Sequence, residues 1–304
     1  MAGCALIASA ACTSTTKTPV TAAPSPATAG KGCARIHTGG AARLGPTRAS
    51  SAIALAKGQS GDRRAIAYIA DADEPTLHTV DLAGPTEVAT TPLIGRPEHV
   101  LVLGDGRVAV TLRASNAIQV LEPAVEADMP LETRCVVGTP TEPIALALTP
   151  DDGTVLLTTG WGHRLSAYDA QTFAPQFEAS LPRDPRSAVV SEDGTRAFVA
   201  HVVGARMSVV DLTTPAHEVR SIDLAARASG EESDNSMLKG CQGFALTRLE
   251  GHADGKLAKM VDRVFAPMWR STPARGSPNR AATDPTGPPR SAKWPSSTPR
   301  PNAL

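Results

Sequence analysis

The chain has 304 residues, of which 41% are hydrophobic, so it is long and apolar enough for one large or two ordinary globular domains. Its 30 basic and 30 acidic residues cancel, and aromatic residues make up only 3%, which together argue against a nucleic-acid-binding protein. The five cysteines include no Cys-x-x-Cys pair, which argues against a clustered metal site and against covalent haem attachment in this chain.

Residues 1–12, MAGCALIASAAC, form an apolar stretch of small residues that ends at Cys12. The stretch resembles the end of a bacterial lipoprotein signal, in which small residues precede a cysteine that carries lipid. It departs from that pattern because it lacks a positively charged start and has Ser9 where a leucine is usual. The resemblance implies lipidation at Cys12 and an extracytoplasmic chain anchored to a membrane of the cell envelope, in the periplasm or at the outer membrane. The alternative is a frayed apolar terminus.

Residues 13–50 are rich in threonine, proline and alanine, which predicts a flexible tether between the anchor and a folded domain. Cys33 lies in this tether. In an oxidising compartment it can pair with Cys135 or with Cys241, and the spacing does not choose between them.

A repeat of about 40 to 50 residues organises residues 51–268, a spacing typical of repeat architectures. Three markers recur: Asp-Gly dipeptides at 105, 152 and 193, prolines at 97, 143 and 185, and acidic residues at 81, 122, 169 and 211. Between them lie short runs rich in Val, Ile, Leu and Ala, which predict strands. In the last unit these runs are RAFVAH, RMSVVDL, HEVRSIDL and GFALTR, which gives four strands per unit.

The predicted units begin near Ala65, Arg107, Thr154 and Arg196. The Asp-Gly dipeptides are expected to form hairpins that join the last strand of one unit to the first strand of the next. The carboxylates in these turns, such as Asp105 and Asp193, are expected to cap backbone N–H groups rather than to form an acid/base pair. The same role is expected for Asp81, Asp169 and Asp211.

Segments 67–82, 154–169 and 195–212 resemble the YVTN family of β-propeller repeats, within the quinoprotein amine dehydrogenase-like and WD40-like propellers. The resemblance implies an all-β fold, a β-propeller built from four-stranded antiparallel blades. Such propellers usually close a ring of about seven blades. Four nearly complete units and two flanking pieces imply an incomplete ring of about four to five blades, with disordered termini. Open ring ends are expected to expose unpaired strand edges and to favour aggregation.

After Met268 the composition changes abruptly. Residues 269–304 are rich in proline and arginine and contain almost no apolar run, which predicts a disordered tail. The incomplete last unit indicates a truncated or frame-shifted gene. The alternative is a genuine basic tail that docks on a partner.

Aligned repeats place Asp71, Leu112, Gly160 and His201 at equivalent strand ends, where loops of a propeller surround its central channel. His201 is a candidate for ligand binding there, and the alternative is a hydrogen-bonded filler. Trp161 and Arg113 lie in equivalent loops of adjacent units and are candidates for contact with a ligand or partner. The alternative for Trp161 is packing over a blade edge.

No nucleophile elbow, phosphate-binding loop or dinucleotide fingerprint occurs in the sequence, so no catalytic residue is assigned. We expect a non-catalytic, lipid-anchored, extracytoplasmic binding or scaffold module with no metal and no cofactor. Its partner is an unknown protein or small ligand. The alternative is the propeller portion of a redox protein, because some proteins of this resemblance continue into cytochrome c domains. Haem c would then belong to those longer relatives.

Overall fold

The computed structural model describes residues 31–37, 48–57, 65–84, 86–124, 129–224, 227–228, 237–248 and 263–271. These residues form an all-β structure dominated by four four-stranded antiparallel sheets, and they include no α-helix, which confirms the predicted fold class. No helix long and apolar enough to span a membrane occurs in this part of the chain. Cys12, the signal-like segment 1–12, residues 13–30 and 38–47 of the expected tether and residues 272–304 of the expected tail lie outside the described residues.

Each four-stranded sheet is one blade, and the blades are numbered here in chain order. Blade 1 consists of β1 (Ile53–Lys57), β2 (Ala65–Asp71), β3 (Thr76–Asp81) and β4 (Thr86–Pro92). Blade 2 consists of β5 (Val100–Val102), β6 (Val108–Leu112), β7 (Ala117–Glu122) and β8 (Glu132–Gly138). Blade 3 consists of β9 (Pro143–Leu148), β10 (Thr154–Thr159), β11 (Arg164–Asp169) and β12 (Pro175–Ser180). Blade 4 consists of β13 (Pro185–Val190), β14 (Arg196–His201), β15 (Arg206–Asp211) and β16 (Val219–Asp223).

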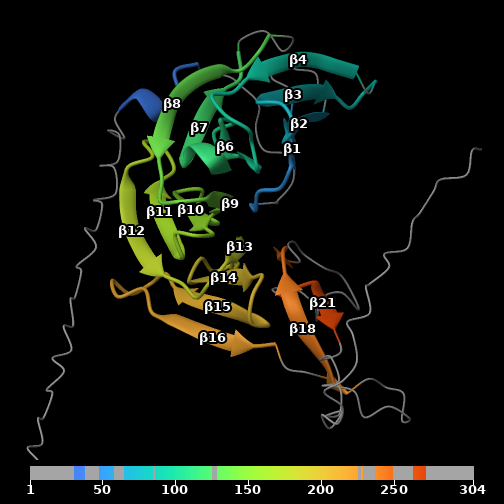
Figure 1. Cartoon of the computed structure of the whole chain (residues 1–304). Coiled ribbons are helices and arrows are strands. Elements are labelled where there is room, and N and C mark those ends of the chain that lie inside the picture. The colour runs from blue at the N-terminus through green and yellow to red at the C-terminus, as the bar shows by residue number, and fades with distance from the viewer. Residues whose placement is uncertain are drawn as a thin grey trace, which may run out of the picture.

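The blades follow an arc, with β1, β9 and β13 toward the inside and β4, β8, β12 and β16 toward the outside (Figure 1). Shorter pieces follow blade 4 along the chain: β17 (Arg227–Ala228), β18 (Met237–Gly243), β19 (Thr247–Arg248), β20 (Val264–Phe265) and β21 (Met268–Ser271). Two short 3-10 helices, η1 (Lys31–Cys33) and η2 (Arg113–Ser115), complete the described elements. The arc leaves a gap between β21 and blade 1 in Figure 1.

The Asp-Gly turns lie inside the blades, which corrects the predicted boundaries between units. The proline-led runs become the first strands β5, β9 and β13, and each pairs with the strand that follows its turn. The reason is that the two strands of a tight hairpin hydrogen-bond to each other and must therefore share a sheet. The predicted units are thus one strand out of phase with the blades.

The turn carboxylates cap their own backbone, as predicted. Asp105, Asp151 and Asp193 each accept a hydrogen bond from the N–H two residues later, at 3.1, 3.1 and 3.0 Å. Positive φ falls at Gly106 and Gly194 in two of the turns, but at Asp152 in the turn of blade 3. The carboxylates Asp81, Asp169 and Asp211 accept backbone N–H bonds in the same way after the third strand of their blades.

The apolar core lies between neighbouring blades, so the inner strands are buried on both faces. All five residues of β6 are buried: Val108, Val110 and Leu112 pack with blade 1, whereas Ala109 packs with blade 3. Burying one such aliphatic side chain contributes about 1.5 to 3 kcal/mol. This two-sided burial explains why these strands are continuous apolar runs rather than alternating patterns.

Blade 1 ends the arc with an exposed sheet face, not with the exposed strand edges expected from the sequence. Ala54 and Ala56 of β1 pack against blade 2, whereas Ile53 and Leu55, which point to the opposite face, are 51% and 42% exposed. In radially stacked sheets a missing neighbour uncovers a face, because the strand edges point toward the centre and the rim of the arc.

Residues 31–37, here called the strap, run along the outer side of blade 2 and are tied to it covalently. Cys33 forms a disulfide with Cys135 of β8, 102 residues later in the chain. The sequence left Cys135 and Cys241 as alternative partners for Cys33, and the structure selects Cys135. Residues 31–37 are therefore packed against the blades, although they lie within the stretch predicted as a tether over residues 13–50.

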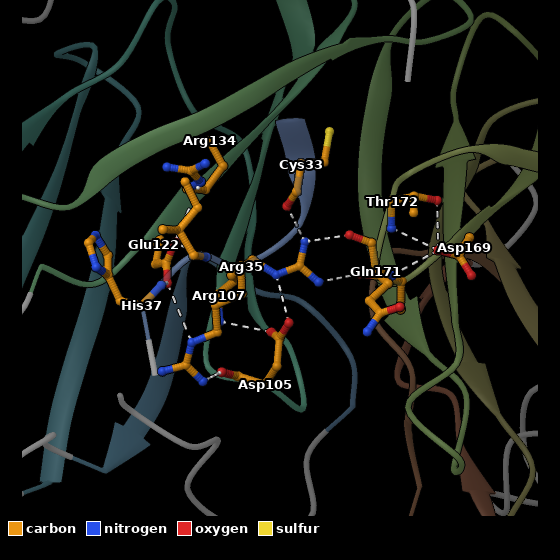
Figure 2. A network of polar contacts seen from close by, with 12 residues as sticks. Cys33, Arg35, His37, Asp105, Arg107, Glu122, Arg134, Asp169, Gln171 and Thr172 are labelled. Carbon is orange, nitrogen blue, oxygen red and sulfur yellow. Dashed lines mark hydrogen bonds and ion pairs between the residues drawn. The ribbon is translucent and has the colours of Figure 1, made fainter. Parts of the chain in front are cut away.

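Two buried charged side chains hold the strap in place (Figure 2). The Glu122 carboxylate, at the end of β7, has no exposed surface and accepts hydrogen bonds from the N–H groups of Ile36 (3.0 Å) and His37 (2.7 Å). The Nε atoms of Arg35 and Arg134 lie 3.4 and 3.5 Å from its two oxygens. The strap thus completes a charged cluster that would otherwise lack two of its donors.

Arg107 is the second of these side chains and is only 1% exposed. Its guanidinium donates to the Asp105 carboxylate (2.7 Å) and to the Cys33 carbonyl of the strap (Figure 2). It also reaches blade 3, where it donates to the carbonyls of Ala170 (2.6 Å) and Gln171 (2.9 Å). One arginine therefore joins the strap, blade 2 and blade 3.

Candidate functional site

The candidate residues lie on one face of the arc, which we call the loop face. It carries the loops between second and third strands and the connectors between blades, because antiparallel strands bring these segments to the same end of the sheets. Asp71 and His201 end the second strands of blades 1 and 4, and Arg113 and Trp161 lie in the loops that follow the second strands of blades 2 and 3. The structure brings Arg113 and Trp161 together through a residue that the sequence analysis missed.

That residue is Glu142, in the connector between blades 2 and 3. Its side chain is 8% exposed, and its Oε1 accepts two hydrogen bonds from the Arg113 guanidinium, from Nε at 2.7 Å and from Nη2. Its Oε2 accepts the backbone N–H of Trp161 at 2.8 Å. Asn116 Oδ1 accepts the N–H of Glu142 at 2.8 Å, and the Glu142 carbonyl accepts the N–H of Gly160 at 2.9 Å. Hydrogen bonds thus fix both the backbone and the side chain of Glu142.

A sequence signal for Glu142 exists. Glu142 and Asp184 each stand directly before the proline that opens a blade, and both adopt a left-handed backbone with φ of 65° and 55°. An acidic residue in this conformation costs energy unless its surroundings hold it. The recurring acid-proline pair therefore marks positions at which the connector is fixed by contacts.

Close packing explains the glycines on either side of Trp161. A Cβ on Gly160 would lie 2.2 Å from Glu142 Oε2, and a Cβ on Gly162 would lie 2.5 Å from Thr159 Oγ1. The loop is therefore pressed against the connector, and the indole between the two glycines is turned outward, 69% exposed rather than packed over a blade edge.

Charges of alternating sign run along the loop face across three blade connectors. Arg113 lies between Glu142 and Glu98, whose Oε1 is 3.8 Å away. Arg186 lies between Glu142 Oε1, at 4.0 Å, and Asp184 Oδ1, at 3.3 Å. The exposed pairs contribute little to stability because water screens them. Their effect is to order the polar surface beside Trp161.

His201 is fully buried, and both of its ring nitrogens have hydrogen-bond partners. Nδ1 lies 3.0 Å from the Arg183 carbonyl and must donate to it, so Nε2 accepts from the Ser208 hydroxyl at 2.8 Å. Burial lowers the pKa of His201, which keeps the ring neutral at pH 7. The ring thus offers no free nitrogen to a ligand in this conformation.

Asp71 closes a turn in blade 1. Its Oδ1 accepts the N–H groups of Asp73 (2.9 Å) and Glu74 (3.2 Å), and these bonds hold the pKa of its carboxyl below the usual range. Of the four candidates, Trp161 and Arg113 form one surface, whereas His201 and Asp71 are engaged in local structure. Among the described residues, no group of three or more His, Cys, Asp or Glu side chains is arranged to hold a metal ion.

No protein-family model and no curated protein sequence matches the chain. Solved structures resemble it at low identity. Hydrazine synthase of Kuenenia stuttgartiensis is 16% identical with a TM-score of 0.45, over 60% of this chain and 49% of that one. The periplasmic gluconolactonase of Pseudomonas aeruginosa is 16% identical with a TM-score of 0.48, over 56% and 53%. Virginiamycin B lyase of Staphylococcus aureus is 14% identical with a TM-score of 0.45, over 66% of each chain.

The matched part of this chain thus spans about half the length of the hydrazine synthase and gluconolactonase chains. The similarity concerns the fold and carries no activity over to this protein.

Proposed function

We propose that this protein is a non-catalytic binding module and that Trp161 is the central contact of its recognition surface. The observation that carries the proposal is that Glu142 fixes the backbone of the loop from which the exposed indole projects. Tryptophan and arginine are the residues most enriched among energetically dominant interface contacts. A loop that is already ordered before binding also loses less entropy when a partner docks.

Arg113 supplies the polar part of this surface. The Arg113 side chain is 41% exposed although two of its nitrogens bond to Glu142, and its third nitrogen, Nη1, lies 3.8 Å from Glu98 Oε1. A partner that combines an apolar contact for the indole with an acceptor for Arg113 fits the chemistry of the surface. Such a partner is a protein segment or an amphipathic small ligand.

Replacing Trp161 by alanine is expected to weaken binding of partners by about thirtyfold, the loss typical of a residue that contributes about 2 kcal/mol. The melting temperature should not change, because the side chain is exposed. The measurement is quantitative capture of proteins and metabolites from the cell-envelope fraction of the native host by immobilised wild type and variant.

Val203→Ala is the matched control, because Val203 is an exposed apolar residue, 46% accessible, in the corresponding loop of blade 4. It should retain the captured partners. A set of partners retained equally by Trp161→Ala and Val203→Ala would refute the assignment of the surface, and turnover of a captured metabolite would refute the non-catalytic role.

We further propose that the protein is extracytoplasmic and anchored to the membrane through a lipid on Cys12. The Cys33–Cys135 disulfide supports this location, because disulfides persist in oxidising compartments and are rare in the cytosol. Labelled fatty acid fed to the native host should be incorporated into the wild type and not into Cys12→Ala. Cys4→Ala, which removes a cysteine from the same segment, is the control and should remain labelled. Label on Cys12→Ala would refute the anchor.

A further inference from the structure

The opposite face of the arc, which we call the turn face, contains two equivalent interblade grooves with different contents. The groove between blades 2 and 3 contains Arg107, is covered by the strap and retains a cavity of about 300 Å³ beside Arg107. The groove between blades 3 and 4 holds a cavity of about 470 Å³.

Hydrogen-bond register shows which residues correspond in the two grooves. Arg107 and Thr154 both end the first turn of their blade, and their carbonyls accept the N–H of Leu103 and Thr149. Cys135 pairs with Val120 in blade 2 as Phe177 pairs with Ala167 in blade 3. Phe177 of the second groove thus corresponds to the disulfide-bonded Cys135 of the first, and Thr154 corresponds to Arg107.

The groups that accept hydrogen bonds from Arg107 have equivalents in the second groove. Arg107 donates to Asp105 and to the carbonyls of the two residues that follow Asp169. The corresponding carboxylate in the second groove is Asp151, and the corresponding carbonyls are the two that follow Asp211.

An aromatic surface is also retained. The Arg107 guanidinium lies 5.9 Å from the centre of the Phe173 ring. His217, which like Phe173 has a left-handed backbone in the turn after the third strand, stacks on Phe177 with ring centres 3.5 Å apart. These two rings line the cavity together with Thr154, Gln176, Asp193 and Leu212.

The charge of the cavity rim suits a cation. Hydrogen bonds from Ser191 and Thr195 lower the pKa of Asp193 to about 2, and bonds from Thr149 and Gly153 lower the pKa of Asp151, so both carboxylates are ionised at neutral pH. Arg48 and Arg196 are the basic residues that interact with them. Arg48 donates to the carbonyl of Pro150, which lines the cavity, but neither arginine is itself among the described residues that line it.

We propose that the cavity between blades 3 and 4 binds the arginine side chain of an extended peptide segment of a partner protein. The guanidinium of the peptide would occupy the place that corresponds to Arg107 of the first groove, where blade 2 itself supplies the arginine. This site is separate from Trp161, on the other face of the arc, so it goes beyond the proposed recognition surface and does not depend on it.

The test uses a short arginine-containing peptide taken from the chain itself. The probe is the acetylated and amidated peptide KGAARIH, which is the sequence of residues 31–37 with alanine at the cysteine, and the comparison peptide carries citrulline in place of arginine. Titration calorimetry with the full chain, disulfide intact, should show saturable binding of the arginine peptide. The citrulline peptide should bind at least about tenfold more weakly, because it lacks the charge-assisted hydrogen bond of the arginine.

Thr154→Arg should fill the cavity with a guanidinium of the chain itself and weaken peptide binding by about tenfold or more. Thr154→Ser leaves the cavity open and should bind within about twofold of wild type. Circular dichroism checks that each variant is folded. The comparison of the arginine and citrulline peptides on the wild type tests the proposal without any variant. Absence of saturable binding to wild type up to about millimolar peptide, or equal binding of the citrulline peptide, would overturn the proposal. Unchanged binding to folded Thr154→Arg would overturn the assignment to this groove.

Discussion

Replacing Glu122 by alanine is expected to lower the free energy of unfolding by about 3 to 5 kcal/mol, the usual loss when one partner of a buried ion pair is removed. The carboxylate is fully buried and accepts two backbone N–H groups of the strap. Without it, Arg35 and Arg134 keep their charges in a largely buried place and lose the oxygens that lie 3.4 and 3.5 Å from their Nε atoms. Urea denaturation followed by circular dichroism measures the change.

Glu132→Gln is the control for this experiment. Glu132 pairs directly with Glu122 across β7 and β8, but its side chain is 53% exposed and forms an ion pair with His37, so the change should stay within about 0.5 kcal/mol. Limited proteolysis should also cleave the strap faster in Glu122→Ala than in Glu132→Gln. Equal denaturation midpoints for the two variants would show that the buried cluster does not stabilise the fold.

The fold was predictable because its signals are local. A tight turn with an aspartate cap and an apolar run with defined ends each involve fewer than about ten residues, and their repetition along the chain indicates stacked sheets. RAFVAH was predicted as a strand and forms β14 with the same bounds. The phase of the blades was wrong, because self-similarity fixes the length of a repeat and not the strand at which a sheet begins. GFALTR was also wrong as a single strand, since Gly243 ends β18 and only Thr247–Arg248 form β19.

The candidate site was predictable only in part. Trp161 and Arg113 were singled out because they occupy equivalent loops, and the structure places them on one surface. Glu142, which connects them, was missed because its contacts reach residues 19 and 29 positions away along the chain. Arg107 and Glu122 were missed as structural centres for the same reason, since their partners in the strap lie 74 and 86 residues away.

Replacing Cys33 and Cys135 by serine is expected to lower the free energy of unfolding by about 3 to 5 kcal/mol, because a disulfide that closes a loop of about 100 residues removes much entropy from the unfolded chain. The strap should also detach, since Cys33 positions the carbonyl that Arg107 binds. Thermal unfolding of wild type and of the double variant, each with and without dithiothreitol, measures this contribution.

Reductant should destabilise the wild type to the level of the double variant and should leave that variant unchanged, which separates loss of the bond from any packing defect caused by serine. If dithiothreitol had no effect on the wild type, the bond would contribute nothing, and the strap would depend on Glu122 and Arg107 alone. A large effect has a further consequence for the proposed location. A chain kept in a reducing compartment would lose the bond and retain only the polar contacts of the strap, so the stability of this fold would depend on maturation in an oxidising one.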